Sequence, residues 1–259
     1  VIGMSGRYAL SSNLDEFWEN LLQGVCMIRD FPKDRISKVN AYKKAMMYDG
    51  SYQMGAYLDE IDMFDYKLYG LSKREASTMS PSQRIMLDVM YDVLVEAGYT
   101  KETVSATKTG IFVGHSDDLR LSYSEMVKNL QPEDASMSIP GNLSAIVASR
   151  LAYTFNMKGP SVLVDTACSS FLTALHLACQ SLENDCDMAV VGGIKINLLP
   201  LDGETKLGME SSDGFTRTFS NDSDGTGTGE GAGAVVLKKL NKALADKDNI
   251  IAVIKGSAI

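Results

Sequence analysis

The stretch that decides the fold of this chain reads Ser161-Val162-Leu163-Val164, then Asp165-Thr166-Ala167-Cys168-Ser169-Ser170, then Phe171-Leu172-Thr173-Ala174-Leu175-His176-Leu177-Ala178-Cys179. Its apolar start predicts a strand, its amphipathic end predicts a helix, and the small residues between them predict a tight turn. Cys168 would then lie in the first turn of the helix, near unpaired backbone N–H groups and the positive end of the helix dipole. Both features favour a thiolate, so we expect a nucleophile at Cys168 rather than the structural role that a lone cysteine more commonly has.

Apolar runs continue on both sides of this stretch. They predict further strands at residues 109–114, 187–193, 233–237 and 250–254. These runs are apolar on both faces, which is typical of strands buried between helical layers. Helices should alternate with them, so the sequence predicts an α/β layered domain. Residues 26–60 show no clear period and are expected to form a long surface excursion.

Two helices have clear end signals. Residues 14–22 predict a helix with Ser12 or Asn13 as its N-cap and Gly24 as its stop. A second helix should begin at Ser80-Pro81 and end at Gly98. Its buried face is predicted to comprise Ile85, Met86, Val89, Met90, Val93, Leu94 and Ala97.

Composition narrows the function classes. The 259 residues are 45% hydrophobic and 22% charged, as in ordinary globular chains. No apolar run reaches the ~18 residues of a membrane span, and no signal peptide is evident, so we expect a cytosolic location with reduced thiols. The net charge of −8 argues against non-specific nucleic-acid binding. We expect no metal site, because no metal-like pairing is found among Cys26, Cys168, Cys179 and Cys186.

The segment from Val164 to Ser170, with Ala174-Leu175-His176-Leu177-Ala178 after it, resembles the active-site motif of β-ketoacyl synthases. The resemblance is greatest to ketosynthase domains of modular type I polyketide synthases, and it extends over nearly the whole chain in the order of that family. Further matching landmarks are Val1–Arg7, Phe64–Ala76, Met79–Arg84, Gly141-Asn142, Ala148–Leu151, Lys158–Pro160, Asp213–Phe219 and Asp224–Gly233. Ser80 replaces the usual aspartate of the family, and Tyr69 replaces an aromatic residue that is usually phenylalanine.

The resemblance implies a thiolase-like layered αβαβα fold, of which residues 1–259 would supply mainly the N-terminal half. The family's condensation also needs histidines from the C-terminal half, and neither histidine of this chain fits. His176 would lie roughly 12 Å along the helix from Cys168 and on another face, so it should be structural. His115 is expected to be a surface or loop histidine. We therefore expect a ketosynthase N-terminal portion cut from a longer polypeptide, with the catalytic histidines outside this chain.

The same resemblance implies an acyltransferase that is part of a polyketide synthase. Cys168 would accept a polyketide acyl chain from the phosphopantetheine arm of an acyl carrier protein, and the domain would bind no cofactor of its own. The complete domain would then catalyse decarboxylative Claisen condensation with a malonyl-type extender. Expected partners are acyl carrier proteins, acyl thioesters, a second copy in a homodimer, and other synthase domains of the same polypeptide.

Other functions stay open at this point. A non-elongating ketosynthase-like transacylase would keep Cys168 and only transfer acyl groups. A non-catalytic scaffold would dimerise and dock carrier proteins, although it would not need the cysteine. A thiolase or a fatty-acid elongating enzyme is a further alternative, but Arg74-Glu75-Ala76 and Arg217-Thr218-Phe219 resemble the type I synthases more.

The remaining site candidates surround the nucleophile. The N–H of Cys168 is a candidate oxyanion donor. Candidate substrate contacts are Ala167 and Ser169 beside it, and Met209, which the resemblance places near the acyl pocket. Ser169 and Ser170 are equally well explained as helix-starting residues.

Two further features have structural explanations. Phe171 is expected to be a packing residue. The glycine-rich run 225–233 precedes a strand instead of following one, so we expect tight backbone packing there rather than a phosphate cradle. Glu230 within this run is expected to be a buried, paired carboxylate.

Overall fold

The computed structural model describes residues 1–116, 121–201 and 208–259. Its centre is a five-stranded sheet with the strand order β1-β7-β5-β3-β4. The strands are β1 (Gly3–Tyr8), β3 (Thr109–Gly114), β4 (Ser161–Val164), β5 (Met188–Lys195) and β7 (Gly231–Lys238). Strands β4, β3 and β5 run parallel, whereas β7 is antiparallel to both of its neighbours. A small separate sheet pairs β2 (Gly55–Ala56) with β6 (Thr228–Gly229).

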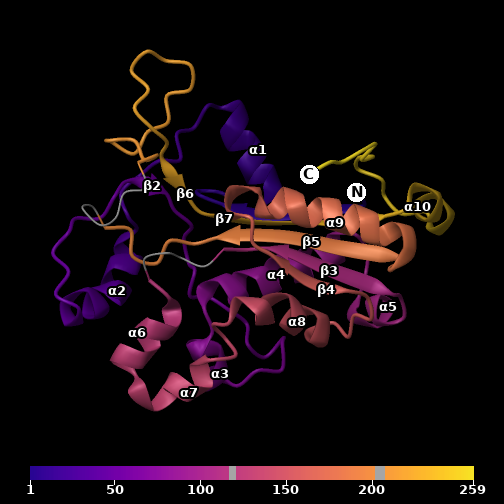
Figure 1. Ribbon diagram of the computed structural model, residues 1–259, viewed down its shortest axis with the longest axis horizontal. Coiled ribbons are helices and arrows are strands. Elements are labelled where there is room, and N and C mark those ends of the chain that lie inside the picture. The colour runs from indigo at the N-terminus through magenta and orange to yellow at the C-terminus, as the bar shows by residue number, and fades with distance from the viewer. Residues whose placement is uncertain (117–120, 202–207) are drawn as a thin grey trace.

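Helices cover both faces of the large sheet (Figure 1). Helix α9 (Ser170–Asn184) packs on one face, and α4 (Pro81–Glu96) and α8 (Ser144–Thr154) pack on the other. Successive residues of one strand therefore enter different cores: Val190 joins the cluster with α4, and Val191 joins the cluster with α9. This alternation explains why the strand runs are apolar on both faces.

The remaining helices surround this layered centre (Figure 1). They are α1 (Leu14–Leu22), α2 (Lys33–Ala45), α3 (Lys73–Thr78), α5 (Lys101–Ser105), α6 (Tyr123–Leu130), α7 (Ala135–Ser138) and α10 (Leu240–Asp246), with short 3₁₀ turns η1 (Pro132–Asp134) and η2 (Ala167–Ser169).

The end signals of both predicted helices are confirmed. The Asn13 side chain accepts a hydrogen bond from the N–H of Glu16 at 2.9 Å and caps α1. The Ser80 side chain accepts from the N–H of Gln83 at 3.3 Å and caps α4. Gly24 and Gly98 have φ of +66° and +79° after the two helices, a conformation that glycine adopts at low cost.

The predicted surface excursion at residues 26–60 is wrong. This segment contains α2 and contributes Phe31, Tyr42 and Tyr57 to the main core. Helix α2 was missed because its buried face begins with a charged residue: Arg35, Val39 and Tyr42 have helical spacing, but only the last two are apolar.

The predicted strand at residues 250–254 is also wrong. The segment has no assigned secondary structure and lies beside the first residue of the chain, where Val1 N donates to Ala252 O at 2.8 Å and Ile251 N donates to Val1 O at 2.9 Å. Within the described residues, Val1 is the only residue that pairs with this segment through backbone hydrogen bonds, so no strand ladder forms. A run of apolar β-branched residues has a high propensity for strand, but a strand also needs a neighbour that hydrogen-bonds to it along its length.

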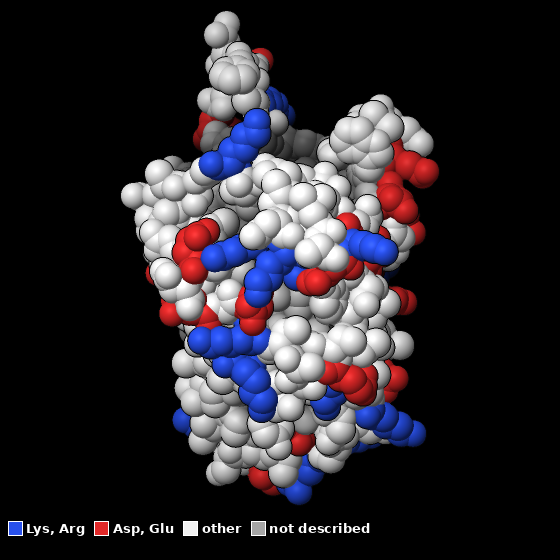
Figure 2. Space-filling view, turned by 90° about the vertical axis from the view of Figure 1, so that its right-hand side faces the viewer, with Lys and Arg blue, Asp and Glu red and all other residues white. Residues whose placement is uncertain are grey.

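The face on the right of Figure 1, which carries α5 and α10, has acidic and basic groups interspersed (Figure 2). Lys239, which precedes α10, pairs with Glu183, and Lys242 in α10 pairs with Asp187. The surface there is therefore mixed in sign rather than a single charged patch. Among the helices of the described residues, none has the length and apolar character needed to cross a membrane.

Candidate active site

Cys168 lies exposed in the tight turn between β4 and α9. The predicted strand, turn and helix are confirmed, but the cysteine belongs to the 3₁₀ turn η2 that precedes α9 rather than to the first α-helical turn. Ala167 has φ of +55°, the left-handed region that a residue with a Cβ seldom adopts. Backbone strain of this kind is often found at functional sites, and here it lies directly before an exposed cysteine.

Side chains around the turn hold this conformation. Asp165 Oδ1 accepts hydrogen bonds from Ala167 N at 3.1 Å and from Ser116 Oγ. These two bonds, that from Ser116 being the stronger, lower the pKa of Asp165, so the carboxylate stays ionised at neutral pH. Ser170 Oγ donates to Ala167 O at 2.7 Å and accepts from Thr166 N at 2.9 Å. Both the N–H and the C=O group of Ala167 are therefore hydrogen-bonded.

Close backbone packing sets the position of the turn on the sheet. A Cβ on Gly114, the last residue of β3, would lie 2.5 Å from Phe171 N and 2.6 Å from Ser170 C. A Cβ on Gly193 of β5 would lie 3.0 Å from Phe171 Cδ2. The missing side chains let the start of α9 rest on the carboxyl ends of β3 and β5, and the expectation that Phe171 is a packing residue is confirmed.

The hydroxyl groups next to Cys168 are engaged within the turn. Ser169 Oγ donates to Thr166 O at 2.8 Å, and Ser170 bridges Thr166 and Ala167 as described above. Within the described residues, neither hydroxyl caps a free N–H group of α9, so the explanation of these serines as helix-capping residues is wrong: the hydroxyls are bonded to Thr166 and Ala167 instead. Whether Ala167 and Ser169 also contact a substrate stays a prediction.

Met209 lies in a different segment from the turn. Its carbonyl oxygen accepts from Thr226 N at 2.8 Å, and its side chain is 57% exposed. A substrate contact at Met209 stays a prediction.

The two histidines differ in their surroundings. His115 was expected at the surface but is only 8% exposed, with its Nδ1 3.4 Å from Ile194 O. It is buried because it directly follows β3, at the end of the sheet where the carboxyl ends of the parallel strands β3 and β5 meet. His115 contributes to lowering the pKa of Asp165, after the hydrogen bonds from Ser116 and Ala167. His176 is buried on α9, with Nδ1 2.9 Å from Ser257 Oγ, which agrees with the structural role predicted for it.

Glu230 is a buried, paired carboxylate, as predicted. Its two oxygens lie 2.6 and 2.9 Å from the two terminal nitrogens of Arg35, an ion pair that joins residues 195 positions apart. Leu58 N and Asn197 N also donate to it, at 2.9 and 2.7 Å. Sequence reasoning missed Arg35: its spacing places it on the same helix face as Val39 and Tyr42, but nothing nearby in the sequence indicates that a charged residue there is buried.

The glycine-rich run packs tightly against other backbone. A Cβ on Gly227 would lie 2.1 Å from Gly214 O, and one on Gly225 would lie 2.5 Å from Glu210 C. This confirms close backbone packing and gives no open cradle at these positions. No group of three or more His, Cys, Asp and Glu side chains within the described residues is arranged to hold a metal ion.

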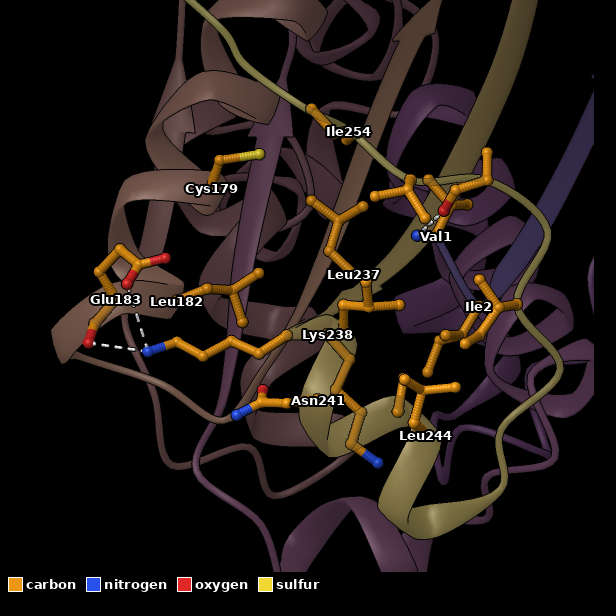
Figure 3. A pocket seen from close by; sticks show the side chains of 16 residues that line it. Val1, Ile2, Cys179, Leu182, Glu183, Leu237, Lys238, Asn241, Leu244 and Ile254 are labelled. Atoms are coloured by element: carbon orange, nitrogen blue, oxygen red, sulfur yellow. Dashed lines mark hydrogen bonds and ion pairs between the residues drawn. The ribbon is translucent and has the colours of Figure 1, made fainter.

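A hollow of about 540 Å³ opens elsewhere, between α9, α10, β7 and the C-terminal segment (Figure 3). Cys179 lines it together with Leu182 and Leu237, whereas Cys168 does not. Burial raises the pKa of the Cys179 thiol, which disfavours its thiolate at neutral pH. Although Cys179 lines a large hollow, its raised pKa argues against a role as a competing nucleophile.

Known proteins are similar to this chain in sequence. Residues 1–243 match the profile of the "Beta-ketoacyl synthase, N-terminal domain". A non-reducing polyketide synthase of Aspergillus novofumigatus is 39% identical over 100% of this chain and 11% of its own length. The polyketide synthase PksL of Bacillus subtilis is 37% identical over 100% of this chain and 6% of its own length.

Solved ketosynthase domains have the same fold. A ketosynthase of the bacillaene synthase of Bacillus subtilis has a TM-score of 0.80 and 37% identity, over 96% of this chain and 41% of that structure. An oxazolomycin ketosynthase domain of Streptomyces albus has a TM-score of 0.84 and 35% identity, over 98% of this chain and 46% of that structure. The chain thus has the fold of ketosynthases, as predicted, and spans less than half of each of these structures.

Proposed function

Because this chain belongs to the β-ketoacyl synthase family, whose members are acyl-transferring, condensing enzymes, we propose that Cys168 is its acyl-accepting nucleophile. The observation that carries the proposal is an exposed cysteine in a strained turn at the carboxyl ends of parallel strands. Ligands of open α/β sheets commonly bind beside such strand ends. The hydrogen bonds of Asp165 and Ser170 would keep the thiol in one orientation as substrates come and go.

The proposed step is a thioester exchange. The thiolate of Cys168 attacks the carbonyl carbon of an acyl-phosphopantetheine thioester presented by an acyl carrier protein. A new carbon–sulfur bond forms, and the tetrahedral intermediate expels the phosphopantetheine thiolate, which takes up the proton given up by Cys168. Backbone N–H groups at the start of a helix lack intrahelical acceptors, so the N–H of Cys168 is our candidate donor to the oxyanion.

Condensation would need more polypeptide than residues 1–259. We propose that the family's C-terminal half, with its histidines, covers the outer face of α9 and the segment after α10. Leu172 on α9 is 64% exposed, and Ile251 and Val253 are 41% and 50% exposed. Apolar surface of this kind is typical of an interaction face. Residues 1–259 would then be the nucleophile-bearing portion of a polyketide synthase ketosynthase, acting in the cytosol on a malonyl-type extender.

We also propose a homodimer. Strand β4 is an edge of the large sheet, and Ser161 at its start is exposed. An edge strand offers unpaired backbone groups to a second copy. Pairing there would bring two nucleophile turns close to the interface, since Cys168 follows β4 directly.

The test uses the full-length protein. A short-chain acyl thioester is added, and the Cys168 peptide is read by mass spectrometry. Wild type should gain one acyl group on Cys168, and Cys168→Ala should gain none, whereas Cys26→Ala, which removes another exposed cysteine, should load normally. Loading that persists in Cys168→Ala would refute the proposal. Loading without condensation on addition of a malonyl-charged carrier protein would identify the transacylase alternative.

A further inference from the structure

A second concave site lies between α2, the start of α4 and α6. It has a volume of about 270 Å³, slightly below the usual range for pockets that bind drug-sized ligands, which suits a small ligand. Its walls are mostly apolar, with Val39, Ile61, Met126, Val127, Leu130 and Leu198 among the lining residues. Cys168 does not line it, so the groove is separate from the candidate active site.

Arg84 is the unusual residue of this groove. It is 7% exposed, and within the part of the chain that the structure describes its Nη1 has one long contact, of 3.5 Å to Asp62 O. Among the described residues, its Nε has no hydrogen-bond partner, which is also true of Arg35 and Arg150, but those two have terminal nitrogens paired with carboxylates. A guanidinium has five N–H donors, and a buried cation that leaves donors unused is costly. Burial accordingly lowers the pKa of Arg84 from its ordinary value.

The neighbouring charged groups are already paired. The carboxylate of Asp62 lies 2.6 Å from Lys38 Nζ, and Asp88 is bonded to Arg7 and Tyr69. Both carboxylates attract Arg84, but within the described residues its side chain donates only to the carbonyl of Asp62. Arg35, which also lines the groove, holds Glu230 with both terminal nitrogens. Among the described cations that line the groove, Arg84 is therefore the one whose terminal nitrogens have no carboxylate partner, and its guanidinium carbon lies 5.9 Å from the centre of the Tyr123 ring.

We propose that this groove binds a small aliphatic carboxylate, whose anionic end pairs with Arg84 and whose chain lies along Met126, Val127 and Leu130. A guanidinium presents parallel N–H donors that match the two oxygens of a carboxylate. The apolar wall favours an alkyl chain over a strongly hydrated anion such as inorganic phosphate. This site is independent of acyl transfer at Cys168.

The probe is octanoate, titrated calorimetrically into the full-length protein. We expect saturable binding that Arg84→Met weakens by about 10- to 100-fold, the usual effect of losing a charge-assisted hydrogen bond. The methionine keeps apolar volume while removing the charge. Arg150→Met is the matched control, because the Arg150 guanidinium already pairs with Glu75 at 3.1 Å, and it should bind octanoate as wild type does.

Three further comparisons make the test decisive. Acetate should bind more weakly than octanoate, because it leaves the apolar wall uncovered. Leu130→Glu places a carboxylate at the rim of the groove, where Leu130 is 40% exposed, and should weaken binding even if Arg84→Met fails to fold. Acylation of Cys168 should leave binding unchanged. Octanoate binding that is equal in wild type and a folded Arg84→Met, or no saturable binding below ~10 mM, would overturn the proposal.

Discussion

The buried ion pair between Arg35 and Glu230 gives the sharpest test of how this fold is held together. Both side chains are almost fully enclosed, 3% and 0% exposed. Each oxygen of Glu230 accepts two hydrogen bonds, one from Arg35 and one from a backbone N–H, of Leu58 or Asn197. Arg35 in turn donates to Leu58 O at 3.2 Å and Asn197 O at 2.8 Å. The pair thus satisfies backbone groups of two segments distant in sequence.

Replacing Glu230 by glutamine keeps the shape but breaks this pattern. The amide has one acceptor oxygen, and its NH₂ group must face two donors, so one side of the network loses both bonds. Breaking a buried pair by neutralising one partner costs about 3 to 5 kcal/mol. Local opening should therefore become about 100-fold to several thousand-fold more frequent. Hydrogen exchange of the Leu58 and Asn197 amides in the full-length protein, read by mass spectrometry, measures this directly.

The controls separate this network from ion pairing in general. Asp213→Asn removes a carboxylate that Arg217 binds at the surface, where solvent screens the pair, and should leave local exchange nearly unchanged. Arg35→Met with Glu230→Leu should not restore protection, because four backbone groups lose their partners. Exchange in Glu230→Gln within a factor of about 3 of wild type, or full rescue by the apolar double variant, would refute the reasoning.

Three other predictions follow from single features. Gly114→Ala should push the start of α9 away from β3, which should cost about 1 to 3 kcal/mol of stability and slow acyl loading of Cys168. The control Gly229→Ala should load normally, because its Cβ would meet only Ala56 Cβ, at 3.7 Å. Equal loading rates for the two variants would contradict the packing argument. Burial raises the pKa of Asp88 despite its bonds to Tyr69 and Arg7, so ionising this carboxyl group costs stability. The urea midpoint of wild type, relative to that of Asp88→Asn, should therefore fall as pH rises from ~4 through the raised pKa. A difference in midpoint that does not change with pH would contradict this prediction. Residues 1–259 expressed alone should aggregate or self-associate through the exposed face of α9 and the C-terminal segment, and a monodisperse monomer in light scattering would argue against a covering half.

The parts of the fold that could be predicted are those with local signals. The strand, turn and helix around Cys168 follow from a change of hydrophobic period within a short stretch, and the caps Asn13 and Ser80 act on residues three positions away. Helix α2 could not be found in this way, because Arg35 is buried only through a partner far along the chain. The same holds for residues 250–254, where propensity favours a strand but the described chain supplies only Val1 as a neighbour.

The candidate site shows the same division between local and distant causes. Cys168 was found from its immediate neighbours, but the left-handed conformation of Ala167 was not, since nothing local favours it in a residue with a Cβ. Its cost of about 1 to 3 kcal/mol is comparable to that of the hydrogen bonds that Asp165 and Ser170 make to Ala167, at about 0.5 to 1.5 kcal/mol each. Asp165 is in turn held by Ser116, after β3.

The exposure of Cys168 is therefore a property of several strand ends rather than of its motif alone. Gly114 and Gly193, the positions where β3 and β5 lack side chains, allow Phe171 to sit against the sheet, and this fixes where α9 begins. The sheet fixes the start of α9, and Asp165 and Ser170 bind the N–H and C=O groups of Ala167. Together these contacts keep Ala167 in its left-handed conformation. A change at Gly114, 54 positions before the cysteine in the numbering, should then alter its reactivity as strongly as a change beside it.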